Sequence, residues 1–334
     1  DTASAARACL ELAAVLDKQK EYDSAFAMLN KAAALHQTLP GITNVNKDHL
    51  FDSIAKNKAG FDKKLLSRWT VNDFSKDALP IPCFLFGFLR SGTTLTEQVL
   101  AVHPDLFTSD ENELIFELTQ ELAKITGITN SIPEALSTCD RENIRHLRRF
   151  YWQRVQEEYG VEAINKKFID KVALNSIDAG FISAIFPEAN ILFALRDPRD
   201  VCISCYMQSF TPSTATVNLF SWQGVARQYA AVMDLWLYLR EIIQPTYLEL
   251  RYEETINDFE TTYRRVFNLL KVDWRPEVTY FHQHAQGRYI HTPSFADVSR
   301  PLYNTAVARW HRYESHFDPI LPELNRFIEA FGYK

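Results

Sequence analysis

The chain has few cysteines, no long hydrophobic run and no excess of positive charge. Its longest apolar stretch, residues 83–89, is far shorter than the about 20 residues that a membrane-spanning helix needs, so we expect no membrane span. Its 5 cysteines are scattered and odd in number, which argues against a disulfide framework and favours a reducing, cytoplasmic location. The net charge of −6 argues against nucleic-acid binding through bulk charge, so any bound anion must be held by local arginines.

Residues 1–75 are predicted to form a helical segment. Apolar side chains at helical spacing predict a hairpin of two helices that ends near Pro40-Gly41; they are Leu12, Val15, Leu16, Ala25, Phe26 and Leu29. This pattern resembles part of a tetratricopeptide repeat, although any amphipathic helix pair would explain it almost as well. A lone repeat cannot bury its apolar face, so the hairpin must pack on the rest of the chain or end a longer array, and it could take a protein partner. The chain begins at Asp1 without a methionine, and we expect it to be part of a longer protein.

Residues 76–334 are predicted to form an α/β domain. The prolines at 80 and 82 mark its start, because they disfavour helix. Short apolar strands then alternate with helices: strands at 83–88, 167–169, 191–195 and 246–252, and helices from about 93, 200 and 258. This alternation predicts a mostly parallel sheet that is covered by helices.

The loop after the first strand has the spacing of a nucleotide-binding P-loop but lacks its lysine. Gly87-x-x-x-x-Gly92-Thr93-Thr94 matches G-x-x-x-x-G-K-[ST] except that Thr93 replaces the lysine, while Arg90 places a positive charge before the glycine. Backbone N–H groups at such a helix start form an anion site, and the alternative is a plain strand-to-helix turn. Phosphoryl-transfer enzymes use the lysine together with magnesium. Transfer of a less charged sulfuryl group needs no metal clamp, and we expect none.

Two stretches resemble the nucleotide-binding motifs of sulfotransferases that use 3′-phosphoadenosine 5′-phosphosulfate (PAPS). Their 5′-phosphosulfate loop is similar to the run Arg90, Ser91, Gly92, Thr93, Thr94 and Leu95. Their 3′-phosphate motif is similar to "LRDPRDVCISCY", in which Arg196 and Ser204 hold the phosphate-binding places. Arg196 would follow the carboxyl end of a strand, where open α/β sheets bind ligands. The alternative for Arg196 is a surface ion pair with Asp197 or Asp200.

The stretch "TTLTEQVLAVHPDLFTSDENELI" is similar to tyrosylprotein sulfotransferases, whose catalytic glutamate lies on the helix after the loop. Glu111 stands at that glutamate's distance from Arg90, Asp110 replaces the other acid of the pair, and His103 is expected to be structural. Together with the helical hairpin, these motifs look closest to bacterial tetratricopeptide-repeat sulfotransferases. The resemblance implies a P-loop-like sulfotransferase fold with a central, mostly parallel sheet after a small helical segment.

The same resemblance assigns further cofactor contacts. Lys171 in "FIDKVALN" matches a lysine that contacts the bridging oxygen of the sulfate, and its alternative is a solvated lysine paired with Asp170. Tyr252 matches a tyrosine beside the cofactor, and its alternative is packing at the edge of the sheet. A later loop implies contacts from Ser294 and Arg309, with Arg300 as a further candidate. Gln208 replaces a second basic residue after the 3′-phosphate motif, which puts that contact in doubt.

The resemblance implies in-line transfer of a sulfuryl group from PAPS to an acceptor hydroxyl. Glu111 would accept the acceptor's proton, and Lys171 and Arg90 would stabilise the leaving adenosine 3′,5′-bisphosphate. The acceptor stays open between a tyrosine peptide, a saccharide and a phenol. A P-loop kinase-like enzyme and a non-catalytic repeat scaffold with a decayed cofactor site are the alternative functions.

Three other patterns have simpler interpretations. Cys202-x-x-Cys205 is expected to be a pair of buried structural cysteines. His282-x-His284 is expected to lie on the surface or in packing rather than to bind metal. One predicted helix carries four basic residues that could face an acidic peptide, although such runs are usually just solvated: Arg141, Arg145, Arg148 and Arg149.

Overall fold

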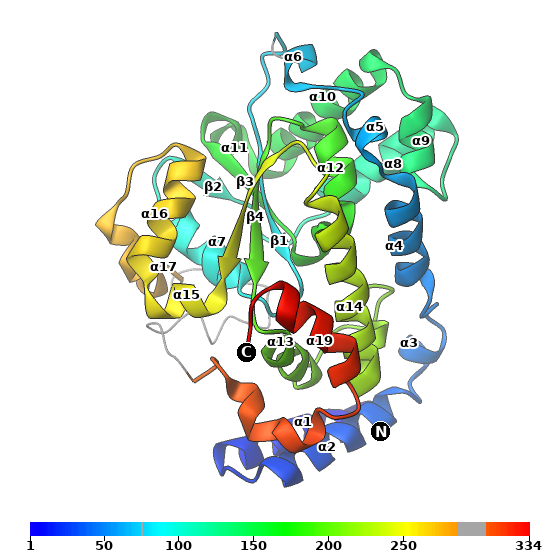
Figure 1. Cartoon of the computed structure of the whole chain (residues 1–334), viewed down its shortest axis with the longest axis vertical. Coiled ribbons are helices and arrows are strands. Elements are labelled where there is room, and N and C mark those ends of the chain that lie inside the picture. Colours follow the sequence, from blue (N-terminus) through cyan, green and yellow to red (C-terminus); the bar gives the residue numbers. More distant parts are fainter. Residues whose placement is uncertain (75, 286–304) are drawn as a thin grey trace. The chain divides into compact units, whose positions relative to one another are not determined.

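The computed structural model describes residues 1–74, 76–285 and 305–334 (Figure 1). Its contacts divide the chain into two compact units, each made of separate stretches of sequence. The first unit contains Asp1–Asp52, Arg196–Asp234 and the described residues from 305 on. The second contains Ser53–Leu195 and the residues from Leu235 to the gap that begins at 286. The division into residues 1–75 and 76–334 stays a prediction.

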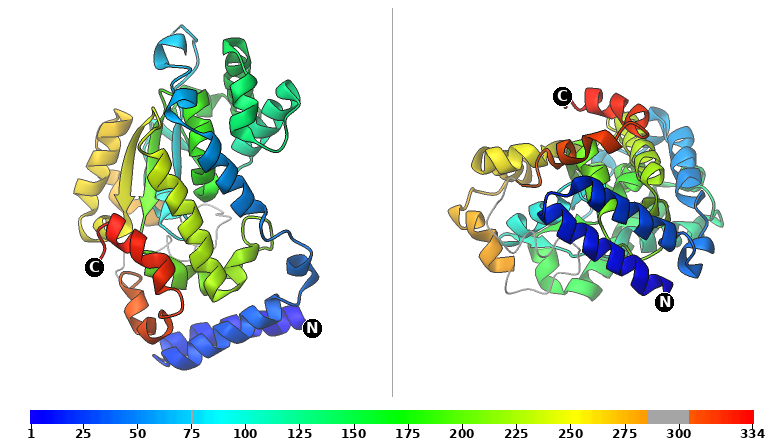
Figure 2. Two further views of the ribbon diagram at one scale, coloured as in Figure 1. Left: turned by 45° about the vertical axis from the view of Figure 1, so that its right-hand side comes forward. Right: turned by 90° about the horizontal axis from the view of Figure 1, so that it is seen from below.

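The first unit is helical. Its elements are α1 (Thr2–Lys18), α2 (Tyr22–His36), α3 (Pro40–Thr43), α13 (Pro198–Tyr206), η2 (Val217–Phe220), η4 (Arg309–His316), α19 (Leu321–Ala330), and parts of α4 (His49–Gly60) and α14 (Trp222–Leu239). The paired helices α1 and α2 form the expected hairpin, which is seen from below in the right panel of Figure 2. Pro40 begins the short helix α3 instead of only ending the hairpin, because proline is tolerated at the first position of a helix.

The hairpin packs within the first unit through one face of α2. The Phe26 ring stacks on His316 with centroids 4.1 Å apart and meets Trp222 edge-on at 5.4 Å. On α1, however, Leu12 and Val15 are 46% and 49% exposed, so they do not belong to the buried face that their spacing predicts. The buried face of α1 carries alanines instead, which let α1 and α2 approach closely.

The second unit contains the strands and most of the helices. Its strands are β1 (Cys83–Gly87), β2 (Leu106–Thr108), β3 (Lys167–Lys171), β4 (Asn190–Leu195) and β5 (Thr246–Arg251). Its helices, besides parts of α4 and α14, are α5 (Lys63–Leu66), α6 (Val71–Phe74), α7 (Thr93–Ala101), α8 (Leu114–Thr126), α9 (Ile132–Thr138), α10 (Arg141–Tyr159), α11 (Val161–Asn165), η1 (Ala173–Asp178), α12 (Ala179–Ile185), α15 (Tyr252–Asn257), α16 (Phe259–Leu270), η3 (Pro276–Tyr280) and α17 (Phe281–Ala285).

The sheet is parallel, with the strand order β2-β3-β1-β4-β5. Strand β1 lies at its centre, between β3 and β4, and all five of its residues are buried. The predicted mostly parallel sheet covered by helices is confirmed. The strand β2 was missed because it has only three residues, of which Leu106 alone is buried.

Both faces of the sheet are covered, as parallel sheets require. On one face, Leu85 and Leu192 pack in a cluster with residues of α7 and α16. On the other face, the rings of Phe86 and Phe193 pack against Trp236 of α14, at 6.2 Å and 3.9 Å between centroids. Successive residues of each strand alternate between these two layers, which explains the continuous apolar runs in the sequence.

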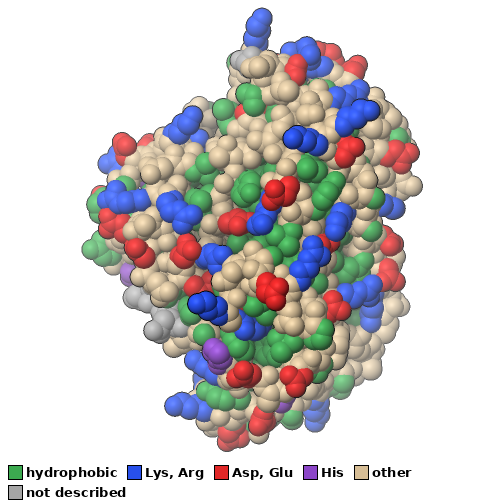
Figure 3. All heavy atoms as spheres, in the orientation of Figure 1, with side chains coloured by type: hydrophobic (Ala, Val, Ile, Leu, Met, Phe, Trp, Pro, Cys, Tyr) green, Lys and Arg blue, Asp and Glu red, His purple; other side chains and the backbone are tan. Residues whose placement is uncertain are grey.

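None of the helices in the described part of the chain combines the length and the apolar composition needed to cross a bilayer. On the face drawn in Figure 3, basic and acidic side chains are interspersed. All 5 cysteines are free, and Cys202 and Cys205 are buried in α13.

Candidate active site

The glycine-rich loop connects the buried strand β1 to helix α7. Two of its residues have left-handed backbone conformations, Arg90 with φ of 65° and Gly92 with φ of 105°. Ser91 lies between them, where its N–H and its hydroxyl both donate to the Phe88 carbonyl, at 3.2 Å and 2.6 Å. Left-handed residues of this kind turn successive backbone N–H groups toward one concave side, which is the geometry of an anion-binding nest. The hydroxyl of Ser91 is already used as a donor within the loop.

Close approach of strand β4 requires a glycine at Gly87, and the left-handed backbone favours one at Gly92. A Cβ at Gly87 would lie 2.4 Å from the Ala194 carbonyl oxygen, and a Cβ at Gly92 would lie 3.1 Å from Cδ2 of Tyr252. Tyr252 is the first residue of α15 rather than the last of a strand, and its ring lies beside the loop. The backbone amides, the helix start and the Arg90 guanidinium suit an anionic group, so these residues fit the phosphosulfate that the motif implies.

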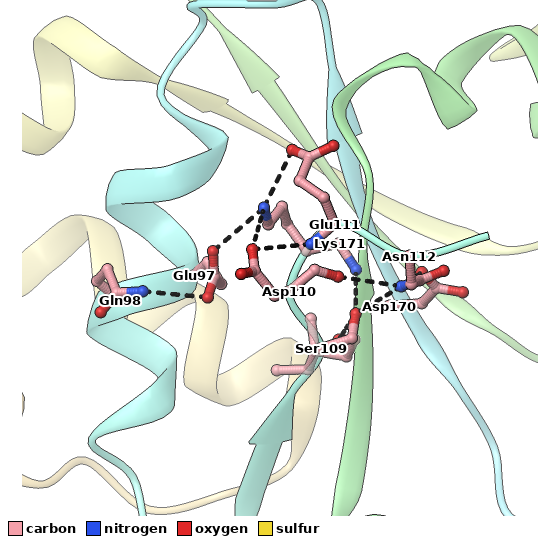
Figure 4. Close-up of polar contacts among 9 residues, drawn as sticks. Glu97, Gln98, Ser109, Asp110, Glu111, Asn112, Asp170 and Lys171 are labelled. Atoms are coloured by element: carbon pink, nitrogen blue, oxygen red, sulfur yellow. Dashed lines mark hydrogen bonds and ion pairs between the residues drawn. The ribbon is translucent and has the colours of Figure 1, made fainter. Parts of the chain in front are cut away.

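A buried lysine lies among three carboxylates at the ends of the strands (Figure 4). Lys171 is the last residue of β3, and its side chain is 0% exposed. Its Nζ lies 3.1 Å from Glu111 Oε1, 3.3 Å from Glu97 Oε2 and 3.5 Å from Asp110 Oδ1. Asp110 and Glu111 belong to the loop after β2, whereas Glu97 projects from helix α7. The structure therefore brings the predicted residues Glu111 and Lys171 together.

Two details of this cluster differ from expectation. Lys171 is not a solvated lysine paired with Asp170, because adjacent strand residues point to opposite faces. Asp170 accepts hydrogen bonds from the Tyr151 hydroxyl and from the Asn112 amide, both at 2.9 Å. Glu111 lies in a loop and not on the helix that follows the glycine-rich loop, because that helix, α7, already ends at residue 101.

The loop that carries Asp110 and Glu111 is tied to β3. The Ser109 N–H donates to the Ile169 carbonyl at 2.9 Å, and the Ser109 hydroxyl oxygen accepts from the Lys171 N–H at 2.9 Å. Asn112 donates to the same hydroxyl and to Asp170. These contacts fix the start of the loop while the side chains of Asp110 and Glu111 stay 35% and 45% exposed.

The electrostatics of the cluster follow from burial. Desolvation raises the pKa of Glu97 to about 7, although Lys171 lowers it, and Asp110 and Glu111 add to the rise. Burial lowers the pKa of Lys171, but the surrounding carboxylates Glu97, Glu111 and Asp110 outweigh it and hold the pKa above its ordinary value. The lysine is therefore a permanent cation, and Glu97 is the carboxylate whose charge changes near neutral pH.

Glu97 was missed in the sequence. A signal was present, since Glu97 lies in the run "TTLTEQVLA", whose helix buries residues all round, and glutamate is rarely buried unless it is paired. Glu97 also follows Thr93 by four residues, which places both on one face of the helix. The partner, however, is 74 residues further on, and its identity required the fold.

Arg196 and Ser204, from the stretch that resembles a 3′-phosphate motif, lie in the first unit. Arg196 is buried there and donates to the Ala306 carbonyl at 2.6 Å, with its Nη2 3.8 Å from Oδ2 of Asp200. Arg196 therefore does pair with Asp200, but this ion pair is buried and does not lie on the surface. Desolvation raises the pKa of Asp200 to about 6 against the lowering effect of Arg196. Ser204 follows on α13 and is also buried.

Of the remaining predicted cofactor residues, Arg309 precedes Trp310, whose N–H donates to Asp200 at 2.8 Å. Arg309 donates to Asp17 of α1 at 2.8 Å, and this pair belongs to the first unit. Ser294 and Arg300 lie outside the described residues. His103 is buried after α7, where its Nδ1 accepts from the Asp105 N–H and its Nε2 lies 2.9 Å from the Asp273 carbonyl, which agrees with a structural role.

The four arginines of α10 that could have faced an acidic peptide differ in their surroundings. On α10, Arg148 is buried and donates to the Ile185 carbonyl at 2.7 Å and to Glu188. Arg141 pairs with Asp73 at 2.6 Å, and Arg145 pairs with Glu142 at 2.6 Å. Three of the four arginines are therefore paired within the second unit, and Arg149 is exposed. In the part of the chain outside the gaps, no group of three or more His, Cys, Asp and Glu side chains is arranged to hold a metal.

Comparison with known proteins agrees with this architecture. A family model described as the sulfotransferase family matches residues 82–276, which is more than half of the chain. The chain belongs to the sulfotransferase family. Two solved structures show the same fold: the sulfotransferase domain of the curacin biosynthetic pathway (TM-score 0.50, 17% identity, 77% of this chain and 99% of that one) and that of a Synechococcus olefin synthase (TM-score 0.51, 19% identity, 77% and 97%).

Curated relatives extend the likeness along the sequence. An uncharacterised protein of Aquifex aeolicus is 26% identical over 93% of this chain and 40% of its own length. The nodulation protein NoeE of Sinorhizobium fredii is 25% identical over 71% of this chain and 62% of its own. Protein-tyrosine sulfotransferase A of Caenorhabditis elegans is 24% identical over 73% of this chain and 66% of its own. The chain thus spans only part of the length of these relatives.

Proposed function

We propose that this sulfotransferase moves a sulfuryl group from PAPS to an acceptor hydroxyl. The observation that carries the proposal is the contact of Lys171 with Glu111 at the carboxyl ends of the strands, in the unit that holds the glycine-rich loop. A fixed cation beside a partly exposed carboxylate supplies both charges that displacement at sulfur needs. The structural fit of the loop to an anion supports the same proposal.

The donor would be held by the two motifs. Arg90, the amides of the loop and the hydroxyls of Thr93 and Thr94 would hold the 5′-phosphosulfate, with Tyr252 beside them. Arg196 and Ser204 would hold the 3′-phosphate, as the resemblance implies. When bound, PAPS supplies the sulfuryl group and its departing half is adenosine 3′,5′-bisphosphate.

Two residues of the second unit, Glu111 and Lys171, would then have separate roles in the reaction. An oxygen of the Glu111 carboxylate would accept the proton of the acceptor hydroxyl, because its side chain is the most exposed of the cluster. The Lys171 ammonium, which stays protonated, would stabilise negative charge that develops beside it. The interior location of Lys171 strengthens this effect, since water does not screen it.

The acceptor is proposed to be a tyrosine hydroxyl, with a saccharide or a phenol as the other outcomes of the test. This choice rests on the similarity to protein-tyrosine sulfotransferases of Caenorhabditis elegans and Drosophila melanogaster. The paired arginines of α10 give it no support, so recognition of an acidic peptide would need other residues.

The test is transfer of label from radiolabelled PAPS to a panel of tyrosine peptides, glycans and phenols. Glu111→Gln should lose about 10²- to 10⁴-fold in kcat while still binding adenosine 3′,5′-bisphosphate. The control is Glu113→Gln, which also removes one negative charge, but from an exposed residue outside the cluster. It should keep the rate of the wild type. A Glu111→Gln variant that turns over at the rate of the control would refute the assigned role.

A further inference from the structure

The three carboxylates around Lys171 differ in how firmly they are held. An ammonium group has three N–H donors, and each of the three carboxylates lies within 3.5 Å of Nζ. Asp110 and Glu111 sit in a loop and are 35% and 45% exposed, whereas the side chain of Glu97 is 5% exposed. Two of the contacts can therefore be exchanged for contacts with a bound molecule, and the third cannot.

Glu97 is fixed by the helix that carries it. Helix α7 packs in the core through Leu95 and Val99, so its backbone position is set by buried apolar contacts. The neighbouring side chain of Gln98 donates to Glu97 Oε1 at 3.1 Å, which leaves Oε2 facing Lys171 (Figure 4). One oxygen of the Glu97 carboxylate thus accepts a hydrogen bond from Gln98, and the other contacts Lys171.

The proposed function requires Glu111 to exchange the lysine for an acceptor hydroxyl. We propose that Glu97 is a positioning residue that holds the Lys171 ammonium in place when Glu111 turns to the acceptor, an inference that rests on the proposed function. Without Glu97, the buried ammonium would keep its remaining charge partners on the loop, because an uncompensated buried charge is strongly disfavoured. Glu111 would then stay bound to the lysine and would be less available as the base.

The pH dependence of the ion pair between Glu97 and Lys171 follows from the charges around Glu97. The charged groups that act on its carboxylate are Lys171 from β3 and Asp110 and Glu111 from the loop after β2. Burial raises the pKa of Glu97 to about 7, so the carboxylate is neutral well below that pH and charged above it. The attraction between Glu97 and Lys171 therefore strengthens as the pH rises through about 7, and kcat should rise with it.

The experiment compares the wild type with Glu97→Gln, Glu97→Asp and the control Glu113→Gln. In Glu97→Gln, kcat should fall at least tenfold and as much as about 10²-fold, the effect of misplacing a reacting group by about 1 Å, while the acceptor KM and the Kd for adenosine 3′,5′-bisphosphate change little. The rise of kcat near pH 7 should be absent in this variant. Glu97→Asp keeps the charge on a shorter side chain and should recover part of the rate and the pH dependence.

A second readout needs no turnover. The side-chain NMR signals of Lys171, assigned by their loss in Lys171→Arg, report its pKa in the protein without nucleotide. That pKa should be lower in Glu97→Gln than in the wild type, because one of its three anionic partners is gone. Glu113→Gln should leave it unchanged.

The outcomes separate the two claims. Wild-type enzyme that transfers no sulfuryl group to any acceptor contradicts the proposed function. Active wild type, with kcat, its pH profile and the Lys171 pKa the same in Glu97→Gln as in Glu113→Gln, overturns the positioning role alone. A loss that appears in KM but not in kcat also overturns it, since a positioning residue of the lysine acts on the reaction step.

Discussion

The free energy of unfolding of Glu97→Gln, measured relative to the wild type, should increase as the pH rises. In the folded chain, burial raises the pKa of Glu97 from its ordinary 4.5 to about 7. Between these two values the folded protein binds a proton that the unfolded chain has released, so unfolding becomes easier as the pH increases. Glutamine does not titrate, and this part of the pH dependence disappears in the variant.

The size of the effect follows from the two pKa values. A single group with a pKa of about 7 folded and 4.5 unfolded reduces the free energy of unfolding by about 2.5 kcal/mol between about pH 5 and about pH 8. The difference between glutamine and a protonated Glu97 adds a nearly constant offset, because both side chains are neutral. The pH-dependent part of the contact with Lys171 is already contained in the pKa of Glu97. The prediction therefore concerns the slope of the difference between variant and wild type and not its absolute value.

The assay is urea unfolding followed by tryptophan fluorescence at several pH values, with Glu113→Gln as the control. The free energy of unfolding of Glu97→Gln minus that of the wild type should grow by about 2.5 kcal/mol across the window, with most of the change below about pH 7. The control minus the wild type should stay flat. Parallel curves for Glu97→Gln and wild type would show that Glu97 titrates normally and would refute the argument from burial.

Three further changes test other parts of the structure. Gly92→Ala places a side chain at φ of 105° and against Tyr252, so it should weaken binding of adenosine 3′,5′-bisphosphate at least tenfold in calorimetry; binding like that of the wild type would mean that the loop is not the anion site. Glu188→Ala leaves the buried Arg148 without its main partner and should cost about 3–5 kcal/mol in urea unfolding, whereas a loss below 1 kcal/mol would show that the ion pair contributes little. Asp17→Ala removes the acceptor of two hydrogen bonds that join α1 to η4 and should lower the free energy of unfolding by about 1–3 kcal/mol, a prediction that an unchanged value would contradict.

The central strands and the loop could be predicted because their signals are local. Buried parallel strands appear as short continuous apolar runs, and a glycine-rich turn between a strand and a helix has a recognisable spacing. The exception among the strands is β2, whose three residues are too few to show a period. The contact of Glu111 with Lys171 was anticipated only through resemblance to a family, since 60 residues separate them.

The features that were missed depend on long-range packing. Glu97 looked like one acid in an ordinary helix, and only the fold shows that this helix faces the end of β3. Arg148 looked like part of an exposed basic face, but a helix turns different residues toward the core, and this one meets Glu188 across 40 residues of sequence. Side chains of long charged residues can be buried or exposed at the same helical spacing, and the choice is made by partners elsewhere in the chain.

We propose that one nucleotide with two phosphate groups is the natural ligand of the chain. Isothermal titration calorimetry with adenosine 3′,5′-bisphosphate, without magnesium, tests this most directly. We expect saturable binding with one site per chain, weakened at least tenfold by Thr93→Ala and by Arg196→Ala and unaffected by Glu113→Gln. Absence of binding, or tighter binding of ATP with magnesium than of adenosine 3′,5′-bisphosphate, would contradict it.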